Sequence, residues 1–282
     1  MQIKQALKFA AKKINNLDAE VLLYNLLNKN KEFLYTHPEY KLDKNNLNKF
    51  KKYISRRKNG EPVAYIVKNK NFFSLNFYVN KNVLIPRPET EILVEECLKI
   101  CRDATCCVSN ILYICTGSGC IIISLAYNLK NKKIKYIATD ISKKILDVAR
   151  KNAKKYKLNI NFIKSNLLKN IYPAFGNVKD YILIANLPYL PDKIDELTRT
   201  VLAYEPKKAL YSGKNGLDLY RKLFLEITKL KNKPKYILIE ICNNHAEKII
   251  KIIKNNLKNY KIKIKPDLAG LNRALICHKT NY

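Results

Sequence analysis

The sequence predicts an α/β protein in which a small helical domain precedes a doubly wound, mainly parallel β-sheet. Three observations lead to this fold class. Apolar residues recur three and four positions apart over roughly the first 58 residues, which is the period of amphipathic helices. From Glu91 onward, short apolar runs alternate with helical stretches, as they do in parallel sheets with crossover helices. A glycine-containing turn follows the first of these runs, where ligands of such sheets bind.

Residues 1–60 are expected to form a helical domain built from three apolar sets. None of the sets alternates as a strand would, and Asp43 is placed to cap the third helix. Because helices this short are unstable alone, we expect them to pack on one another. The sets are Ile3, Leu7, Ala10, Ala11 and Ile14; Ala19, Leu22, Leu23, Leu26 and Leu27; and Leu47, Phe50, Tyr53 and Ile54.

Residues 61–88 are expected to form a hairpin-like connector, and residues 89–282 the second domain. Gly60-Glu61-Pro62 interrupts the helical pattern, and short Val, Tyr, Ile and Phe runs separated by Asn and Lys follow it. Five apolar runs of the second domain are predicted strands, and ligands should bind at their carboxyl ends. The runs are Ile111–Cys115, Lys135–Thr139, Asn161–Lys164, Tyr181–Ala185 and Tyr236–Glu240.

A glycine turn follows the first predicted strand and precedes an apolar helix over residues 120–129. Its sequence is Cys115-Thr116-Gly117-Ser118-Gly119. Glycines let a ligand approach the backbone and the exposed N–H groups of the helix start. The chain has only 7 glycines, whereas average usage would give about 20. Two of them in this turn are therefore informative, although an ordinary strand–helix connection would account for the turn equally well.

Asp140 ends the next predicted strand, 21 residues after Gly119. At this spacing an acidic residue accepts hydrogen bonds from ribose hydroxyls in a mononucleotide-binding βαβ unit. The alternative is that Asp140 only caps the helix that starts near Ser142. Together, turn and acid predict a cofactor that contains adenosine, without separating NAD from S-adenosylmethionine.

Asn186-Leu187-Pro188-Tyr189 follows the predicted strand Tyr181–Ala185 and therefore lies on the ligand side of the sheet. An amide nitrogen is a poor nucleophile because its lone pair is delocalised. The Asn186 side-chain oxygen and the Leu187 carbonyl could accept its N–H groups, while Tyr189 could stack on the flat group. Pro188 stiffens the loop. Such a site needs no metal or acid–base pair, so it favours methyl transfer from a sulfonium over hydride transfer. The alternative is a plain proline turn.

The chain resembles the bacterial peptide chain release factor glutamine N5-methyltransferases. Asn186 to Tyr189 is similar to the [Asn/Asp/Ser]-Pro-Pro-Tyr signature of amino-methyltransferases, and further similarity extends almost end to end. The segment Ile85-Pro86-Arg87-Pro88-Glu89-Thr90-Glu91 is highly specific to the family. The other matching segments are residues 18–23, 56–66, 116–119 and 204–206, Ala209-Leu210, and residues 213–221 and 267–270.

This resemblance implies a Rossmann-like class I methyltransferase domain behind a helical substrate-recognition domain. It implies S-adenosyl-L-methionine as the cofactor and, as the partner, class I peptide chain release factors, methylated on the glutamine of their Gly-Gly-Gln motif. The same resemblance assigns catalysis and substrate binding to Asn186, Leu187, Pro188 and Tyr189. It assigns cofactor binding to Cys115, Thr116, Gly117, Ser118, Gly119, Asp140, Leu167 and Asn186.

Several positions depart from the family pattern. Cys115 stands where glycine is usual, and a left-handed backbone there would cost about 1–2 kcal/mol. Leu187 replaces the first proline of the signature but keeps its carbonyl. The remaining departures are Tyr113 for an acid, Asn166 for Asp, Leu167 for an aromatic residue, Cys242 for glycine and Asn244 for glutamine. These changes predict weaker cofactor binding.

Two other functions stay open from the sequence. Asn-Leu-Pro-Tyr is the form found in ribosomal RNA adenine dimethyltransferases, and the net charge of +31 would suit RNA. An RNA adenine dimethyltransferase is not expected to contain the segment from Pro86 to Glu91. A non-catalytic binding protein of the same fold is the third interpretation, which the altered glycine turn favours.

The charge itself is a weak guide to a partner. Of 54 basic residues only 8 are Arg, and Lys is spread along the whole chain. A solvated lysine surface is the simpler interpretation, although RNA or the ribosome would be attracted to it. The cysteines Cys97, Cys101, Cys106 and Cys107 have no CxxC spacing and no nearby His, so no metal site is predicted.

No apolar run reaches the roughly 18 residues of a membrane span, and the first residues lack the apolar core of a signal peptide. A cytoplasmic protein that does not associate with membranes is therefore expected.

Overall fold

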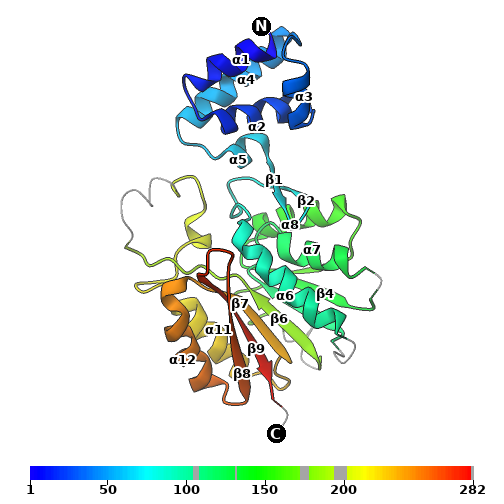
Figure 1. The fold of residues 1–282 in the computed structure, drawn as a ribbon. Coiled ribbons are helices and arrows are strands. Elements are labelled where there is room, and N and C mark those ends of the chain that lie inside the picture. The colour runs from blue at the N-terminus through cyan, green and yellow to red at the C-terminus, as the bar shows by residue number, and fades with distance from the viewer. Residues whose placement is uncertain (104–107, 131, 172–177, 194–201, 281–282) are drawn as a thin grey trace.

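The computed structural model describes residues 1–103, 108–130, 132–171, 178–193 and 202–280. A helical unit lies at one end of the molecule and a larger unit built on a β-sheet at the other (Figure 1). The hairpin of β1 and β2 lies between them. The two-part organisation follows from the change of apolar period that the sequence shows near residue 60.

The helical unit contains all three predicted helices. They are α1 (Ile3–Ala11), α2 (Asn16–Leu27) and α4 (Lys44–Lys58), with a short α3 (Lys31–Thr36) between the last two. Asp43 caps α4 as expected, because its Oδ1 accepts the Asn46 N–H at 2.7 Å. The apolar faces meet in one cluster that includes Leu22, Leu23 and Phe50.

The connector contains the expected hairpin, β1 (Asn69–Phe72) with β2 (Leu75–Tyr78), paired antiparallel. A short helix, α5 (Val63–Val67), precedes it where a strand run was expected. Pro62 stands at the N-cap of this helix, a place that its fixed backbone tolerates. Ile66 packs into the cluster of the helical unit. The domain limits at residues 60 and 88 remain predictions.

The sheet contains the five predicted strands within one or two residues. They are β3 (Asn110–Ile114), β4 (Lys135–Asp140), β5 (Asn161–Lys164), β6 (Tyr181–Ala185) and β7 (Tyr236–Glu240). These five are parallel, and the complete order is β5-β4-β3-β6-β7-β9-β8. The sheet is therefore mainly parallel, as the sequence predicts.

Two further strands, β8 (Tyr260–Pro266) and β9 (Asn272–Lys279), were not predicted. Strand β9 runs antiparallel to both β7 and β8. The signal for β8 is the alternation of Tyr, Ile and Lys in Tyr-Lys-Ile-Lys-Ile-Lys-Pro, which suits a half-buried edge strand. The many lysines hide this pattern because they recur along the whole chain.

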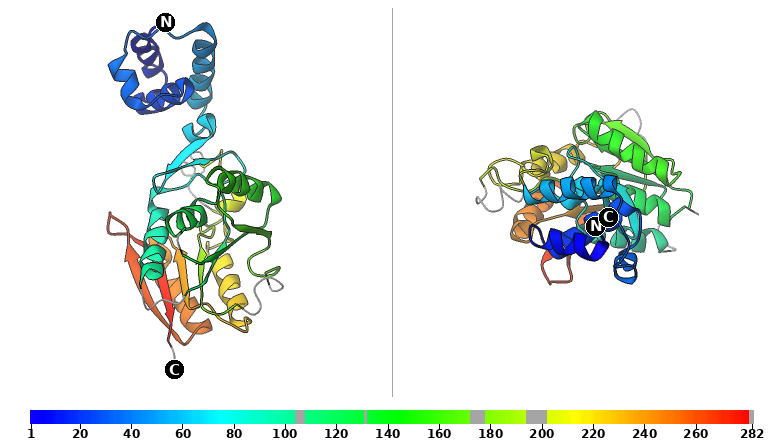
Figure 2. Two further views of the ribbon diagram at one scale, coloured as in Figure 1. Left: turned by 90° about the vertical axis from the view of Figure 1, so that its right-hand side faces the viewer. Right: turned by 90° about the horizontal axis from the view of Figure 1, so that it is seen from above.

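Helices cover both faces of the sheet (Figures 1 and 2). On one face, α6 (Glu91–Arg102) and α7 (Cys120–Asn128) pack on β3 and β6, and α8 (Lys143–Lys155) adds Ala153 to the same cluster. On the other face, α11 (Asp218–Thr228) and α12 (Ala246–Asn256) pack on β6 and β7. Consecutive residues of β6 pack into the clusters on opposite faces of the sheet. Leu183 belongs to the cluster with α11 and α12, and Ile184 to the cluster with α6 and α7, as a sheet covered on both faces requires.

Strand register brings the predicted site residues together. Ile114 of β3 is paired with Thr139 of β4 on one side and with Ala185 of β6 on the other. The residues that follow these three strand positions therefore leave the sheet at the same edge. The chain order reverses between β3 and β6, and such a switch point is where open α/β sheets bind ligands.

Tyr204 and Glu205 of the sheet unit bond to the end of the helical unit and to the connector, respectively. The Tyr204 hydroxyl donates to the Asn59 carbonyl at 2.7 Å. The buried Glu205 carboxylate pairs with Arg87 and accepts the Ile85 N–H at 3.4 Å. The family-specific segment before α6 is therefore held by the segment around Glu205. This contact explains structurally why both segments are found in the same chain.

Candidate active site

A cavity of about 740 Å³ opens at the carboxyl ends of β3, β4 and β6. Most of the residues predicted to bind cofactor or acceptor line it. Gly119, Leu187 and Tyr189 do not. The predicted residues in the lining are Cys115, Thr116, Gly117, Ser118, Asp140, Leu167, Asn186 and Pro188.

The glycine turn is bent by three left-handed residues. Cys115 has φ +60°, Gly117 +56° and Gly119 +82°. Cys115 is therefore one of the non-glycine residues with a left-handed backbone, at a cost of about 1–2 kcal/mol. A Cβ at Gly117 would meet no atom within 4 Å, so this glycine is needed for its backbone and leaves space toward the cavity.

Gly119 allows close packing behind its own Cα position. A Cβ there would lie 2.8 Å from Ile123 Cδ1 and 3.2 Å from Ala149 Cβ. The glycine lets α7 start close to α8, as the last glycine of a dinucleotide turn does. Gly119 does not line the cavity, and its predicted role in cofactor binding remains a prediction.

We expect Gly119→Ala to destabilise the fold by more than Gly270→Ala does. Both glycines have positive φ, so both substitutions should cost about 1 kcal/mol in backbone strain. A Cβ at Gly270 would meet nothing within 4 Å, whereas at Gly119 it clashes, which should add about 1–3 kcal/mol. Urea unfolding of the two variants measures the difference. Equal midpoints would contradict the packing role of Gly119.

Asp140 connects the glycine turn to the start of α8. Its Oδ2 accepts the Gly117 N–H at 3.1 Å, and its Oδ1 accepts the Ser142 N–H at 3.4 Å. Burial raises the pKa of the Asp140 carboxyl, and these N–H groups oppose the shift. Both interpretations of Asp140 are compatible with this geometry, because the carboxylate caps the Ser142 segment and also faces the cavity.

Leu167 and Asn166 form the wall after β5. Leu167 is buried, has φ +54° and lines the cavity. It thus offers an apolar surface at the position where an aromatic residue is usual. Asn166 also lines the cavity, and its Oδ1 accepts a hydrogen bond from Lys222 Nζ at 3.2 Å.

The side chain of Asn186 is held by two hydrogen bonds. Its Nδ2 donates to Glu240 Oε2 at 2.9 Å and to Thr90 Oγ1 at 3.4 Å. Both amide hydrogens are therefore engaged, and Oδ1, which accepts no hydrogen bond from the residues that the structure describes, can accept one from the cavity side. No role was predicted for Glu240 or Thr90. Glu240 ends the strand beside β6, so its position at the sheet edge could have indicated it. Thr90 lies in the segment Ile85–Glu91, whose similarity to the family was the available signal.

The residues after Asn186 face two environments, the cavity and the sheet core. Pro188 faces the cavity, whereas Leu187 is only 1% exposed and packs in the sheet core. Tyr189 packs against the same core, and burial raises the pKa of its hydroxyl to about 12. Stacking of Tyr189 on an acceptor and hydrogen bonding by the Leu187 carbonyl remain predictions.

Backbone pairing after this loop holds it in place. The Leu190 N–H donates to the Leu210 carbonyl, and the Ser212 N–H to the Leu190 carbonyl, both at 2.9 Å. Gly216 lies against the Tyr189 carbonyl, since a Cβ there would be 2.1 Å from that oxygen. The acceptor loop is therefore preorganised before any ligand arrives.

The part of the chain that the structure describes contains neither a metal-binding cluster nor a membrane-spanning helix. No three His, Cys, Asp or Glu side chains there are grouped so that they could hold a metal ion. Cys106 and Cys107 lie outside the described residues. No described helix combines the length and apolar character of a membrane span.

The strand order, the glycine turn, the acid that ends the next strand and the asparagine after β6 define a Rossmann-like methyltransferase domain. Family models agree. Residues 1–67 match the PrmC N-terminal domain, and residues 109–281 match a methyltransferase domain. A release factor glutamine methyltransferase of Mycoplasma mycoides subsp. mycoides is 35% identical over 93% of this chain and 92% of its own length. The chain belongs to the release factor glutamine methyltransferase family.

Two other comparisons place this chain among longer and more distant proteins. A bifunctional methyltransferase of Rickettsia felis is 33% identical over 99% of the chain, which spans 58% of that relative's length. The hMettl16 catalytic domain, solved with a MAT2A 3′UTR hairpin, has a TM-score of 0.59 and 12% identity over 92% of this chain and 91% of its own. The second comparison shows a shared fold alone.

Proposed function

We propose that the protein transfers a methyl group from S-adenosyl-L-methionine to the side-chain amide nitrogen of the glutamine in the Gly-Gly-Gln motif of class I peptide chain release factors. The observation that supports this most is the Asn186 amide. It stands at the cavity edge with both hydrogens engaged and its oxygen available to an acceptor N–H. Membership of the family supports the choice of substrate.

The cavity has features that fit the cofactor. The buried Asp140 carboxylate can accept the ribose hydroxyls, and these donors would offset the desolvation that raises its pKa. Gly117 leaves room for the ligand to approach the backbone of the turn. Leu167 supplies an apolar surface for the flat base. When bound, S-adenosylmethionine supplies an electrophilic methyl group on a sulfonium, so the reaction needs no metal.

The role of the chain is then to orient the acceptor. The Asn186 oxygen accepts an N–H of the glutamine amide, which turns the nitrogen lone pair toward the methyl group. As the N–C bond forms and the bond between the sulfonium and the methyl group breaks, the nitrogen becomes more positive and its N–H groups become stronger donors. The hydrogen bond to Asn186 therefore strengthens toward the transition state, which is the condition for catalysis. The neutral thioether would then leave, and one N–H proton would be lost to water, which gives the neutral methylated amide.

The helical unit is proposed to recognise the release factor. It is tied to the site through Asn59–Tyr204 and through the connector pair Arg87–Glu205. A partner that docks on this unit would be held at a fixed distance from the cavity. A cytoplasmic location and contact with RNA or the ribosome remain predictions from the sequence.

Methyl labelling tests this function against its alternatives. The protein is incubated with labelled S-adenosylmethionine and either a purified class I release factor, the same factor with Gly-Gly-Gln changed to Gly-Gly-Ala, or ribosomal RNA. We expect label in the unaltered release factor alone. Label only in RNA would replace the proposal with an adenine methyltransferase. Calorimetric binding of cofactor without label in any acceptor would indicate a non-catalytic protein.

A further inference from the structure

Glu240 is a buried carboxyl group that the proposed reaction does not use directly. It ends β7, is 2% exposed and does not line the cavity. Ile239 before it is paired with Ala185 of β6, so Glu240 lies beside Asn186 where both strands end. Burying a carboxyl group in an apolar sheet costs free energy, so we expect its hydrogen bonds or its charge to serve a function.

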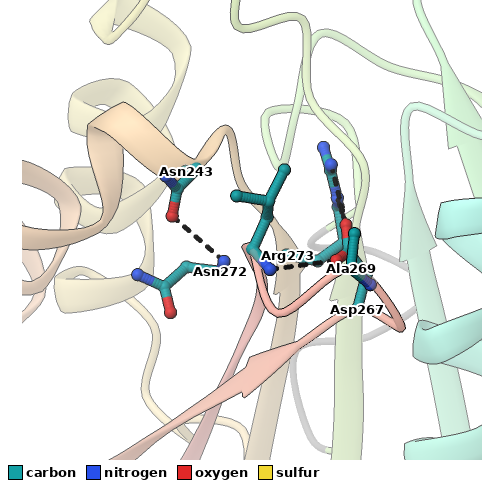
Figure 3. Close-up of polar contacts among 6 residues, drawn as sticks. Asn243, Asp267, Ala269, Asn272 and Arg273 are labelled. Atoms are coloured by element: carbon teal, nitrogen blue, oxygen red, sulfur yellow. Dashed lines mark hydrogen bonds and ion pairs between the residues drawn. The ribbon is translucent and has the colours of Figure 1, made fainter.

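The groups around Glu240 set its charge. Burial raises its pKa to about 7, while a hydrogen bond from the Thr90 hydroxyl and the cations Arg273 and Arg87 oppose the rise and Glu89 adds to it. Strand β9 supplies Arg273, which Asp267 fixes through two hydrogen bonds of 2.9 and 3.1 Å (Figure 3). Glu240 is therefore poised to change charge near neutral pH.

The remaining titratable neighbours stay neutral at that pH. Burial raises the pKa of Tyr113 on β3 and of Tyr220 on α11 well above the usual value, and that of Cys120 on α7 to about 12. The Tyr189 hydroxyl, after β6, is likewise shifted to about 12. Only Glu240 in this group is placed to switch between charged and neutral forms near pH 7.

Asn186, Thr90 and Glu240 form a closed set of hydrogen bonds. Asn186 donates one Nδ2 hydrogen to Glu240 Oε2 and the other to Thr90 Oγ1. Turning the amide over would place Asn186 Oδ1 about where Nδ2 now lies, 2.9 Å from a carboxylate oxygen. Two acceptors facing each other at that distance repel, and an ionised carboxylate has no hydrogen to bridge them. Protonated Glu240 carries such a hydrogen, so it can form a hydrogen bond with either orientation of the Asn186 amide.

We propose that Glu240 is a positioning residue whose carboxylate, with Thr90, fixes the Asn186 amide so that its oxygen faces the acceptor nitrogen. The proposal rests on the function proposed above. It assigns the orientation of the acceptor-binding group to a residue outside the cavity.

Opposite pH trends for rate and stability follow from this role. The rate should rise as pH increases through about 7, because ionised Glu240 locks the productive amide orientation. The contribution of Glu240 to stability should change in the other direction. The pKa of Glu240 in the folded chain lies above the ordinary value of about 4.3. The stability that Glu240 contributes is therefore complete below a pH of about 4.3 and is lost as the pH rises to about 7.

Glu240→Gln, with Glu96→Gln as the matched control, tests the proposal on the full chain. Gln offers one acceptor and one donor, so both Asn186 orientations are satisfied and kcat should fall about two- to tenfold. The KM for the release factor and the cofactor Kd should stay unchanged, and the rise of rate through neutral pH should disappear. Glu96 pairs with Lys99 and Lys265 outside the cavity lining, so its variant should keep the wild-type rate and profile.

Thr90→Val provides a second measurement if the Glu240 variant folds poorly. Loss of the Thr90 hydroxyl removes a bond that lowers the Glu240 pKa, so the rise in rate should move to higher pH. An unchanged kcat and pH profile in Glu240→Gln, or an unmoved profile in Thr90→Val, would overturn the positioning role. If the wild type labels no release factor, the proposed function fails first, which separates the two results.

Discussion

Replacing Asn186 with Ala is expected to lower kcat for the release factor about 100-fold, the usual order for removing one preorganised group aimed at developing charge. The substitution removes the only side-chain oxygen that the Asn186–Tyr189 loop presents to an acceptor N–H at the cavity edge. Because that hydrogen bond strengthens as the nitrogen gains positive charge, the loss should appear in kcat more than in KM. Single-turnover methylation with saturating cofactor measures it.

Binding of the cofactor should be almost unaffected by Asn186→Ala. The turn and Asp140, which are expected to hold the nucleoside, do not contact the Asn186 amide, which is bonded to Thr90 and Glu240. Asn256→Ala is the matched control, since Asn256 uses its amide only to bond the Ile252 carbonyl on α12. A normal kcat combined with lost cofactor binding would reverse the assignment of Asn186.

Replacing Asp140 with Ala is expected to raise the cofactor Kd about 10- to 100-fold. Hydrogen bonds to a charged group contribute about 1.5–3 kcal/mol, and each 1.4 kcal/mol corresponds to about tenfold in Kd. The carboxylate is buried at the cavity wall, where water competes weakly for it. The variant also frees the Gly117 N–H, so part of the loss should come from a looser turn. Calorimetric titration with S-adenosylmethionine measures the change.

Two companion variants separate the contributions of Asp140. Asp140→Asn keeps the size and one acceptor oxygen, so it should lose less affinity than Ala. Asp147→Ala removes an exposed carboxylate paired with Arg150 on α8 and should leave the Kd unchanged. An unchanged Kd in Asp140→Ala would remove Asp140 from the cofactor site.

Local pattern predicted most of the elements and part of the site. Apolar period separated helices from strands, and the spacing from the glycine turn to Asp140 predicted that the turn after β3 and the end of β4 lie side by side. The residue type usual at Cys115 raised the question of a left-handed backbone there, and the structure answers it with a φ of +60°. Strands β8 and β9 were missed because their lysines resemble the rest of the chain. Contact of Gly119 with the cavity was expected but is not observed.

The sequence by itself determined the order of the elements, the turn after β3 and the family of this protein, because these depend on neighbouring residues and on motifs read along the chain. Only the tertiary structure decided which side chains meet. Strand register brings Asn186 and Glu240 together at one edge of the sheet, and the segment before α6 brings Thr90 within hydrogen-bond distance of Asn186. Hydrogen-bond partners and burial are properties of that packing, so the orientation of Asn186 and the charge of Glu240 appear only in the folded chain.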